Sequence, residues 1–252
     1  MRNYPSQKPA EVYFYGTCLV DLIYPEAGVS AIRILEREGV DVVFPQGQSC
    51  CGQPAMNSGY VNESLAVIES QLDLFPKDIP VVIPSGSCAG TMRFDYPRLF
   101  KGHARESHVN ALAERVYEFT EFLNRVLCVR LEDLGRPTRV AQHVSCSSRR
   151  TMQVAEEGTG LLNQLAGVTL LEQARAAECC GFGGTFAIKH DEVSSAMVQD
   201  KVDAISATGA EQLVTGDCGC MMNIAGHMRH RGIDIECMHI AEFIWKRCYA
   251  KD

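Results

Sequence analysis

Short runs of apolar and β-branched residues alternate along the chain with longer segments in which apolar residues recur every three or four positions. The short runs predict buried strands at residues 12–15, 40–44, 81–83, 139–144, 168–171 and 212–215. The periodic segments predict helices at residues 27–38, 63–75, 108–130, 149–166, 192–208 and 239–249. This alternation predicts an α/β fold with parallel sheets and right-handed crossover connections.

Eight of the twelve cysteines form two matching sets. Each set has one cysteine, then an adjacent pair followed by glycine, then a fourth cysteine. The first set is Cys18, Cys50, Cys51 and Cys88, and the second is Cys146, Cys179, Cys180 and Cys220. Corresponding positions are 128, 129 and 132 residues apart, and a predicted strand precedes the equivalent cysteines in both halves. The chain is therefore an internal duplication.

The duplication predicts two pseudo-symmetric parallel-sheet lobes, residues 1–131 and 132–252. Residues 132–137 are the expected linker, because Gly135 and Pro137 interrupt the helical periodicity. Most of the repeated cysteines come just after a predicted strand, and ligands of parallel sheets gather beyond the carboxyl ends of the strands. We therefore expect the four cysteines of each set to converge at one rim of their lobe.

The charge and hydropathy of the chain bear on whether it binds nucleic acid or membranes and on its compartment. The chain carries 24 Lys and Arg against 31 Asp and Glu, a net charge of −7, which argues against nucleic acid or an anionic membrane as the main partner. No apolar run is long enough to predict a membrane span, and the first residues do not resemble a secretory signal. We therefore expect a cytoplasmic protein, in which a disulfide framework is not favoured.

The repeated thiols point to metal chemistry. Four thiolates suit an iron–sulfur cluster, usually of the 4Fe-4S type, and Gly52 and Gly181 allow the turn that brings neighbouring cysteines to one site. Structural zinc also takes four thiolates, although neither half has the paired C-x₂₋₄-C spacing that is common in zinc sites. Zinc in one lobe, or thiols that do redox chemistry without metal, therefore remain alternatives.

At these residues the chain resembles the cysteine-rich CCG family, whose pattern is a cysteine, a Cys-Cys-Gly triplet and a final C-x-x-C pair, usually present twice. The resemblance covers nearly the whole chain and is strongest to the lactate utilisation protein A group. It rests on residues 50–60 (CCGQPAMNSGY), 179–186 (CCGFGGTF) and 216–224 (GDCGCMMNI). Related members include the iron–sulfur subunits of glycolate oxidase and anaerobic glycerol-3-phosphate dehydrogenase, and a subunit of heterodisulfide reductase.

The resemblance implies an iron–sulfur electron-transfer subunit of a multi-protein oxidoreductase that converts L-lactate to pyruvate. The implied partners are a ferredoxin-like iron–sulfur subunit and a third lactate-utilisation protein, and the implied substrate of the complex is a small 2-hydroxy acid. Two alternatives stay open, namely a zinc-stabilised assembly module without catalytic function and a subunit that acts on another 2-hydroxy acid such as glycolate.

The chain departs from the family pattern where the final C-x-x-C pair begins. Ser85 and Asp217 stand there, so each half keeps four of the five family cysteines. Four ligands suit an ordinary four-iron cluster better than the unusual fused cluster proposed for five-cysteine members. Cys218 lies one residue from the lost position and is a possible substitute ligand.

Other residues have simpler interpretations. Cys128, Cys237 and Cys248 have no repeat partner and are expected to be buried apolar fillers. His143, inside a predicted strand, is more often a hydrogen-bonded structural histidine than a metal ligand. The Arg149–Arg150 pair is a candidate for binding a carboxylate, although a solvated helix start is the favoured interpretation.

Overall fold

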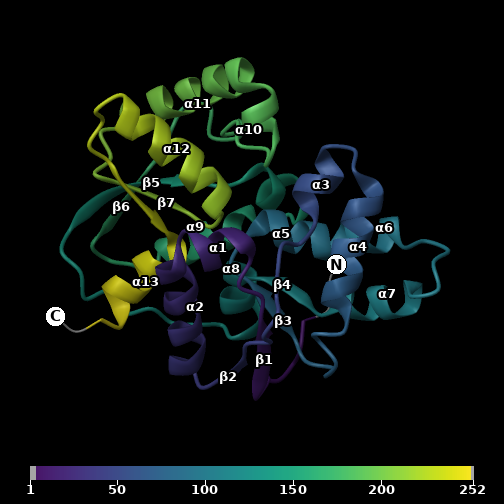
Figure 1. Ribbon diagram of the computed structural model, residues 1–252. Coiled ribbons are helices and arrows are strands. Elements are labelled where there is room, and N and C mark those ends of the chain that lie inside the picture. The colour runs from purple at the N-terminus through teal and green to yellow at the C-terminus, as the bar shows by residue number, and fades with distance from the viewer. Residues whose placement is uncertain (1–3, 251–252) are drawn as a thin grey trace. The chain divides into compact units, whose positions relative to one another are not determined.

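The computed structural model describes residues 4–250 (Figure 1) and divides into two compact units between Val129 and Arg130. Each unit contains a four-stranded, wholly parallel sheet with helices between the strands. This arrangement confirms the predicted α/β fold with two parallel-sheet lobes. No helix in the described part of the chain is long and apolar enough to cross a membrane.

The first lobe is built on strands β1 (Glu11–Phe14), β2 (Asp41–Val43), β3 (Val81–Ile83) and β4 (Val116–Glu118). They pair in the order β2-β1-β3-β4. Strand β3 has no exposed residue, as expected for a central parallel strand that is covered on both faces. The helices are α1 (Cys18–Leu22), α2 (Pro25–Arg37), α3 (Gln53–Asn57), α4 (Val61–Leu72), α5 (Gly86–Gly90), α6 (Tyr96–Leu99), α7 (Glu106–Glu114) and α8 (Phe119–Glu121), with π-helical turns η1 (Thr91–Asp95) and η2 (Phe122–Val126).

The second lobe repeats this plan with strands β5 (Thr138–His143), β6 (Val168–Leu171), β7 (Gln212–Thr215) and β8 (Glu236–His239). They pair in the order β6-β5-β7-β8. The helices are α9 (Ala155–Leu162), α10 (Phe186–Lys189), α11 (Asp191–Ser206), α12 (Cys218–His230) and α13 (Ile240–Cys248), after a π-helical turn η3 (Ser147–Thr151).

The shared strand order determines where each lobe can hold a ligand. The chain leaves the first strand of each lobe toward one edge of the sheet, then returns to the third strand on the other side. The crevice between β1 and β3, and likewise between β5 and β7, is thus a topological switch point at the carboxyl ends of the strands. Cys18 and Cys88 begin or lie in the helices that follow β1 and β3, so the fold places them at this crevice.

The predicted helix over residues 108–130 is wrong in its middle. Helix α7 ends at Glu114 and is followed by strand β4, whose Val116 pairs with Val81. Apolar residues continue at helical spacing through this segment, so its periodicity resembles that of one helix. Pairing with β3 determines the conformation of Val116–Glu118, whose sequence VYE lacks the continuous apolar run VVI of β3.

Two further elements differ from the prediction. The helix expected over residues 149–166 is divided, because Gln153 has a φ of 56° and so cannot continue a right-handed helix. Strand β8 was not predicted, although the helix after it was. His239 caps that helix, since its Nδ1 accepts a hydrogen bond from the Ala241 backbone N–H at 3.1 Å.

The unrepeated cysteines are less buried than expected. Cys128 is exposed, in a turn with a φ of 51°, and its burial as an apolar filler is therefore wrong. It lies two residues after the end of η2 at Val126, in a left-handed backbone conformation that cannot continue the helix. Cys237 and Cys248 are half-buried.

The segment expected to be a linker is held firmly within the second lobe. Asp133 forms a bidentate ion pair with Arg247 of α13, with Nε–Oδ1 and Nη2–Oδ2 distances of 2.9 and 2.7 Å. The two side chains are only 2% and 9% exposed. Gly135 and Gly167 lie against the guanidinium, where a Cβ would come within 2.6 and 2.8 Å of its atoms. Any larger residue at either position would collide with the guanidinium, so both glycines are needed for the arginine to fit.

We expect Arg247→Ala to destabilise the second lobe by about 3–5 kcal/mol, because it leaves the buried Asp133 carboxylate unpaired. The control is Arg139→Ala, which breaks an exposed ion pair with Glu211 and is expected to change stability by at most about 1 kcal/mol. Urea unfolding followed by the fluorescence of Trp245, the single tryptophan, reports on this lobe. Equal effects of the two substitutions would contradict the assigned role of the pair.

Candidate metal centres

The four repeated thiols of the first lobe form a continuous cluster. Cys51 Sγ lies 3.4 Å from Cys88 Sγ. Cys50 accepts hydrogen bonds from the thiols of Cys18 and Cys51, which completes the chain of contacts. Cys51 and Cys88 are buried, whereas Cys18 and Cys50 are half-buried. The structure therefore brings together all four cysteines that the sequence predicts for this lobe.

The Cys50–Cys51 loop is held by side chains from three elements. Tyr15 donates its hydroxyl hydrogen to the Ser49 carbonyl at 2.6 Å, and Gln71 of α4 accepts from the Ser49 N–H at 3.0 Å. Tyr96 of α6 donates to the Cys51 carbonyl at 2.9 Å. These contacts orient the backbone on both sides of Cys50.

The second lobe gathers its thiols in the same sequence. Cys146 Sγ lies 4.0 Å from Cys179 Sγ, and Cys180 is hydrogen-bonded through its thiol to both Cys179 and Cys220. Cys180 and Cys220 are 2% and 6% exposed and belong to the hydrophobic core of this lobe. The predicted convergence thus holds in both halves of the chain.

Gly181 makes the turn between the adjacent cysteines and α11. Its φ is 81°, a conformation that favours glycine, and its N–H donates to Cys179 Sγ at 3.4 Å. A Cβ at this position would lie 2.7 Å from the Ser194 carbonyl oxygen. Ser194 in turn donates its hydroxyl hydrogen to the Gly181 carbonyl at 2.9 Å, as Ser64 does to Gly52 in the first lobe at 3.2 Å. The glycine after each cysteine pair is therefore required by the backbone.

The residues at the lost cysteine positions cap helices. Ser85 precedes α5 and accepts from the Cys88 N–H at 3.5 Å, while Asp217 precedes α12 and accepts from the Gly219 N–H at 3.2 Å. Serine and aspartate are preferred at such positions because their oxygens satisfy the free N–H groups of the first turn. Cys218 is buried in the first turn of α12.

Each thiol cluster favours one anionic sulfur. The hydrogen bond from Cys18, followed by that from Cys51, lowers the pKa of Cys50 far below the usual thiol range. The bonds from Cys146 and Cys180 likewise lower the pKa of Cys179. Within each cluster the donating thiols have raised pKa values, in Cys18 and Cys146 first because they donate to this sulfur and then because they are desolvated. Both clusters can therefore present a thiolate to a cation.

A histidine that the sequence did not favour as a ligand lies beside the second cluster. His143 ends β5, and its ligating nitrogen, Cys180 Sγ and Cys220 Sγ all lie within 4.8 Å of one another. The side chain is fully enclosed, and neither ring nitrogen has a hydrogen-bond partner. The interpretation of His143 as a hydrogen-bonded structural histidine is therefore wrong. Its place three residues before Cys146 was the available signal, but a single histidine in a strand is not distinctive.

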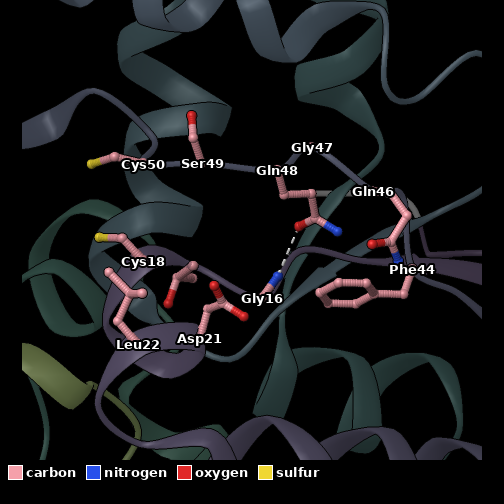
Figure 2. Close-up of a pocket in the computed structure, with 11 residues that line it drawn as sticks. Gly16, Cys18, Asp21, Leu22, Phe44, Gln46, Gly47, Gln48, Ser49 and Cys50 are labelled. Atoms are coloured by element: carbon pink, nitrogen blue, oxygen red, sulfur yellow. Dashed lines mark hydrogen bonds between the residues drawn. The ribbon is translucent and has the colours of Figure 1, made fainter.

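A hollow of about 380 Å³ opens beside the first cluster (Figure 2). Cys18 and Cys50 lie at one end of it, and Phe44 and Gln46 at the other. Gln48 crosses its wall, where its Oε1 accepts from the Gly16 N–H at 2.9 Å. The two half-buried cysteines of this cluster thus line a space that a small molecule or a partner's side chain can enter, and their sulfurs point away from Phe44 and Gln46 (Figure 2).

The donor sets fit a metal or cluster. Each lobe brings four sulfurs together from three separate segments of the chain, and the four have no disulfide among them. Soft thiolates select iron–sulfur clusters and zinc, whereas magnesium and calcium require oxygen ligands. The unpartnered nitrogens of His143 are a further donor with no protein partner. Arg149 and Arg150 occupy η3, where Arg150 is exposed and Arg149 is half-buried.

Comparison with known proteins identifies the family of this chain. The chain matches the family CCG, described as "Cysteine-rich domain", over residues 12–93 and 140–225, one match in each lobe. It is 42% identical to Lactate utilization protein A of Geobacillus sp. (strain WCH70) over 240 residues, which cover 94% of this chain and all of that protein. It is 40% identical to Lactate utilization protein A of Bacillus subtilis (strain 168), with the same coverage.

Among solved structures, a hypothetical protein from Helicobacter pylori has the same fold with a TM-score of 0.69. It is 9% identical, and the match covers the whole of this chain and 51% of that one. The two family matches contain all eight of the repeated cysteines. The chain therefore belongs to the cysteine-rich CCG family and, within it, is a relative of lactate utilization protein A.

Proposed function

We propose that this protein is an iron–sulfur electron-transfer subunit of a multi-protein system that oxidises L-lactate to pyruvate. The observation that carries the proposal is the convergence of four thiols at the switch point of each lobe, in a chain about 40% identical to proteins named for lactate utilisation. The family assignment supports a role in lactate utilisation, and the thiol donor sets support iron–sulfur chemistry.

The proposed ligands are Cys18, Cys50, Cys51 and Cys88 in the first lobe and Cys146, Cys179, Cys180 and Cys220 in the second. A bound four-iron cluster would supply one-electron storage. The protein's own part is to bring the sulfurs together from three segments of each lobe and, in the second lobe, to supply a backbone N–H group to Cys179 and to enclose one side of the site in its core. Cys218 is buried in the first turn of α12, two residues before Cys220, and is a possible substitute ligand in this proposal.

Oxidation of lactate to pyruvate releases two electrons and two protons, and the electrons must reach this chain from the protein that binds lactate. We place that step in a partner, and infer that the partners are a ferredoxin-like iron–sulfur subunit and a third lactate-utilisation protein. The hollow beside Cys18 and Cys50 is the proposed point of approach, because there the thiols of the first lobe are only half-buried. We propose the cytoplasm as the compartment, since reducing conditions keep thiols available for metal.

A second candidate is a zinc-stabilised assembly module without electron transfer. It is favoured by one observation, the spacing of His143, Cys180 and Cys220, whose donor atoms are close enough to share a single ion. Glycolate is the alternative substrate of the complex, since it carries the same 2-hydroxy acid group as lactate.

Anaerobic purification followed by iron, acid-labile sulfide and zinc analysis separates the two candidates. The proposal predicts brown protein with iron and sulfide in nearly equal amounts, as a four-iron cluster requires. Colourless protein that holds only zinc would establish the assembly module in its place.

A further inference from the structure

Among the described residues, His143 has two buried side-chain polar atoms without a hydrogen-bond partner, whereas every other residue of this kind has one such atom. It is 1% exposed, and both Nδ1 and Nε2 are without a hydrogen-bond partner. Buried imidazoles normally donate from one nitrogen and accept at the other, because a buried polar atom without a partner is unfavourable. The fold therefore places an imidazole in the core and leaves both of its nitrogens without a hydrogen bond.

The nearest ligating atoms are sulfurs. The donor atoms of His143, Cys180 and Cys220 lie within 4.8 Å of one another, and all three residues are buried. They come from separate elements, since His143 ends β5, Cys180 follows β6, and Cys220 is in α12 after β7. The pairing of His143 with Thr215 in the β5–β7 ladder fixes the histidine at the carboxyl edge where this lobe's thiols converge.

The position equivalent to His143 in the first lobe holds tyrosine, which offers no nitrogen. Tyr15 stands three residues before Cys18, as His143 stands before Cys146, and its hydroxyl is occupied by the Ser49 carbonyl at 2.6 Å. The helices that pack behind the clusters differ as well. Seven residues after the equivalent serines Ser64 and Ser194, the first lobe has neutral Gln71 and the second has Lys201.

Lys201 adds positive charge to the second site. It is 1% exposed, and its Nζ donates to the Arg175 carbonyl at 2.7 Å. Its ammonium interacts electrostatically with Cys180. Gln71, by contrast, forms hydrogen bonds with both the backbone N–H and the hydroxyl of Ser49. The two lobes share a topology but surround their thiols with different charge.

We propose that His143 is a fifth metal ligand of the second lobe, which joins the four thiols on the side of Cys180 and Cys220, while the first lobe binds through thiolates alone. This inference rests on the proposed metal binding but not on electron transfer or on lactate. The carboxylate of Asp217 acts on Cys146 and Cys220 and offsets the ammonium of Lys201, so the imidazole itself is what distinguishes the second site from the first. A redox-active metal there is therefore expected to have the higher reduction potential, as histidine ligation does in other iron–sulfur proteins.

The test uses Co²⁺ as the probe and the full chain. Cys51→Ser and Cys88→Ser are introduced to remove binding by the first lobe, and metal-free protein is titrated anaerobically with Co²⁺. Cobalt X-ray absorption then identifies the atoms around the ion. We expect a shell with sulfur and one imidazole nitrogen, the latter at about 2.0–2.1 Å, as is typical of such bonds. His143→Ala should abolish the imidazole scattering and weaken Co²⁺ binding at least about 10-fold.

His227→Ala is the matched control. His227 belongs to α12 of the same lobe, is half-buried, and also has an unpartnered Nε2, but it is not in the group with the thiols. This variant should keep both the nitrogen shell and the affinity. A sulfur-only shell in the protein that retains His143 would overturn the proposal whatever the variants do. Because no lactate or partner protein is present, the outcome is separate from that of the proposed electron transfer.

Discussion

Serine in place of Cys146, Cys179, Cys180 or Cys220 is expected to remove about half of the iron from anaerobically purified protein and to reduce lactate-dependent electron transfer at least about 10-fold. Serine keeps the approximate size of cysteine but replaces a soft thiolate with a hydroxyl that hardly ionises. The largest effect is expected at Cys180, which contacts two other thiols of its cluster from inside the core. The measurement is iron per chain and L-lactate-driven dye reduction with the partner proteins present.

The three unrepeated cysteines provide the matched controls. Cys128→Ser should leave both iron content and stability unchanged, because the side chain is exposed. Cys237→Ser and Cys248→Ser should also keep the iron, with a loss of at most about 1–3 kcal/mol of stability from a poorly paired hydroxyl. Iron loss of the same size in both groups would indicate general misfolding. Full iron content in all four variants of the second set would end the ligand assignment.

Removal of the metal is expected to loosen the cysteine loops while leaving both sheets intact. Each site joins three loops that otherwise meet only through thiol contacts and a few hydrogen bonds. A ligand present at a thousand times its dissociation constant stabilises the state that binds it by about 4 kcal/mol. Amide hydrogens that exchange only when the loop opens locally then exchange about 1,000-fold more slowly in the metal-bound form. We therefore expect backbone amides at residues 49–53 and 178–183 to exchange about 1,000-fold faster after chelation.

Hydrogen exchange read by mass spectrometry under anaerobic conditions measures this effect. The amides of β1 and β5 are the internal reference, because these central strands are paired on both sides and should exchange at similar rates with and without metal. Equal protection of the cysteine loops in the two forms would show that the protein alone fixes them, and that no metal organises these sites.

The alternation of strand-like and helical segments was sufficient to predict the fold class, and the duplicated cysteine spacing predicted the gathering of four thiols in each lobe. Strand ends and cysteines coincide in the sequence, and parallel strands bring their carboxyl ends to one edge. Strands β4 and β8 could not be predicted in this way. Val116–Glu118 lacks the continuous apolar run that identified the equally short β3, and it is a strand because it pairs with β3.

The contribution of His143 needed the structure. A lone histidine inside an apolar strand has the same sequence signature whether it is hydrogen-bonded or not. Only the register of β5 against β7 and the positions of Cys180 and Cys220 show that its ring faces sulfur and has no other partner. Comparing the two halves gave a partial signal, since the first lobe has Tyr15 at the equivalent place.

The central claim is that metal centres in this chain take electrons from L-lactate. The most direct measurement loads this chain alone with ⁵⁷Fe, adds the unlabelled partner proteins without oxygen, and records Mössbauer spectra before and after L-lactate. Only iron in this chain contributes, so reduction of the partners does not interfere. The account predicts cluster iron that becomes reduced after L-lactate is added. Cluster iron that stays oxidised while the partners are reduced, or a chain that incorporates zinc and no ⁵⁷Fe, would contradict it.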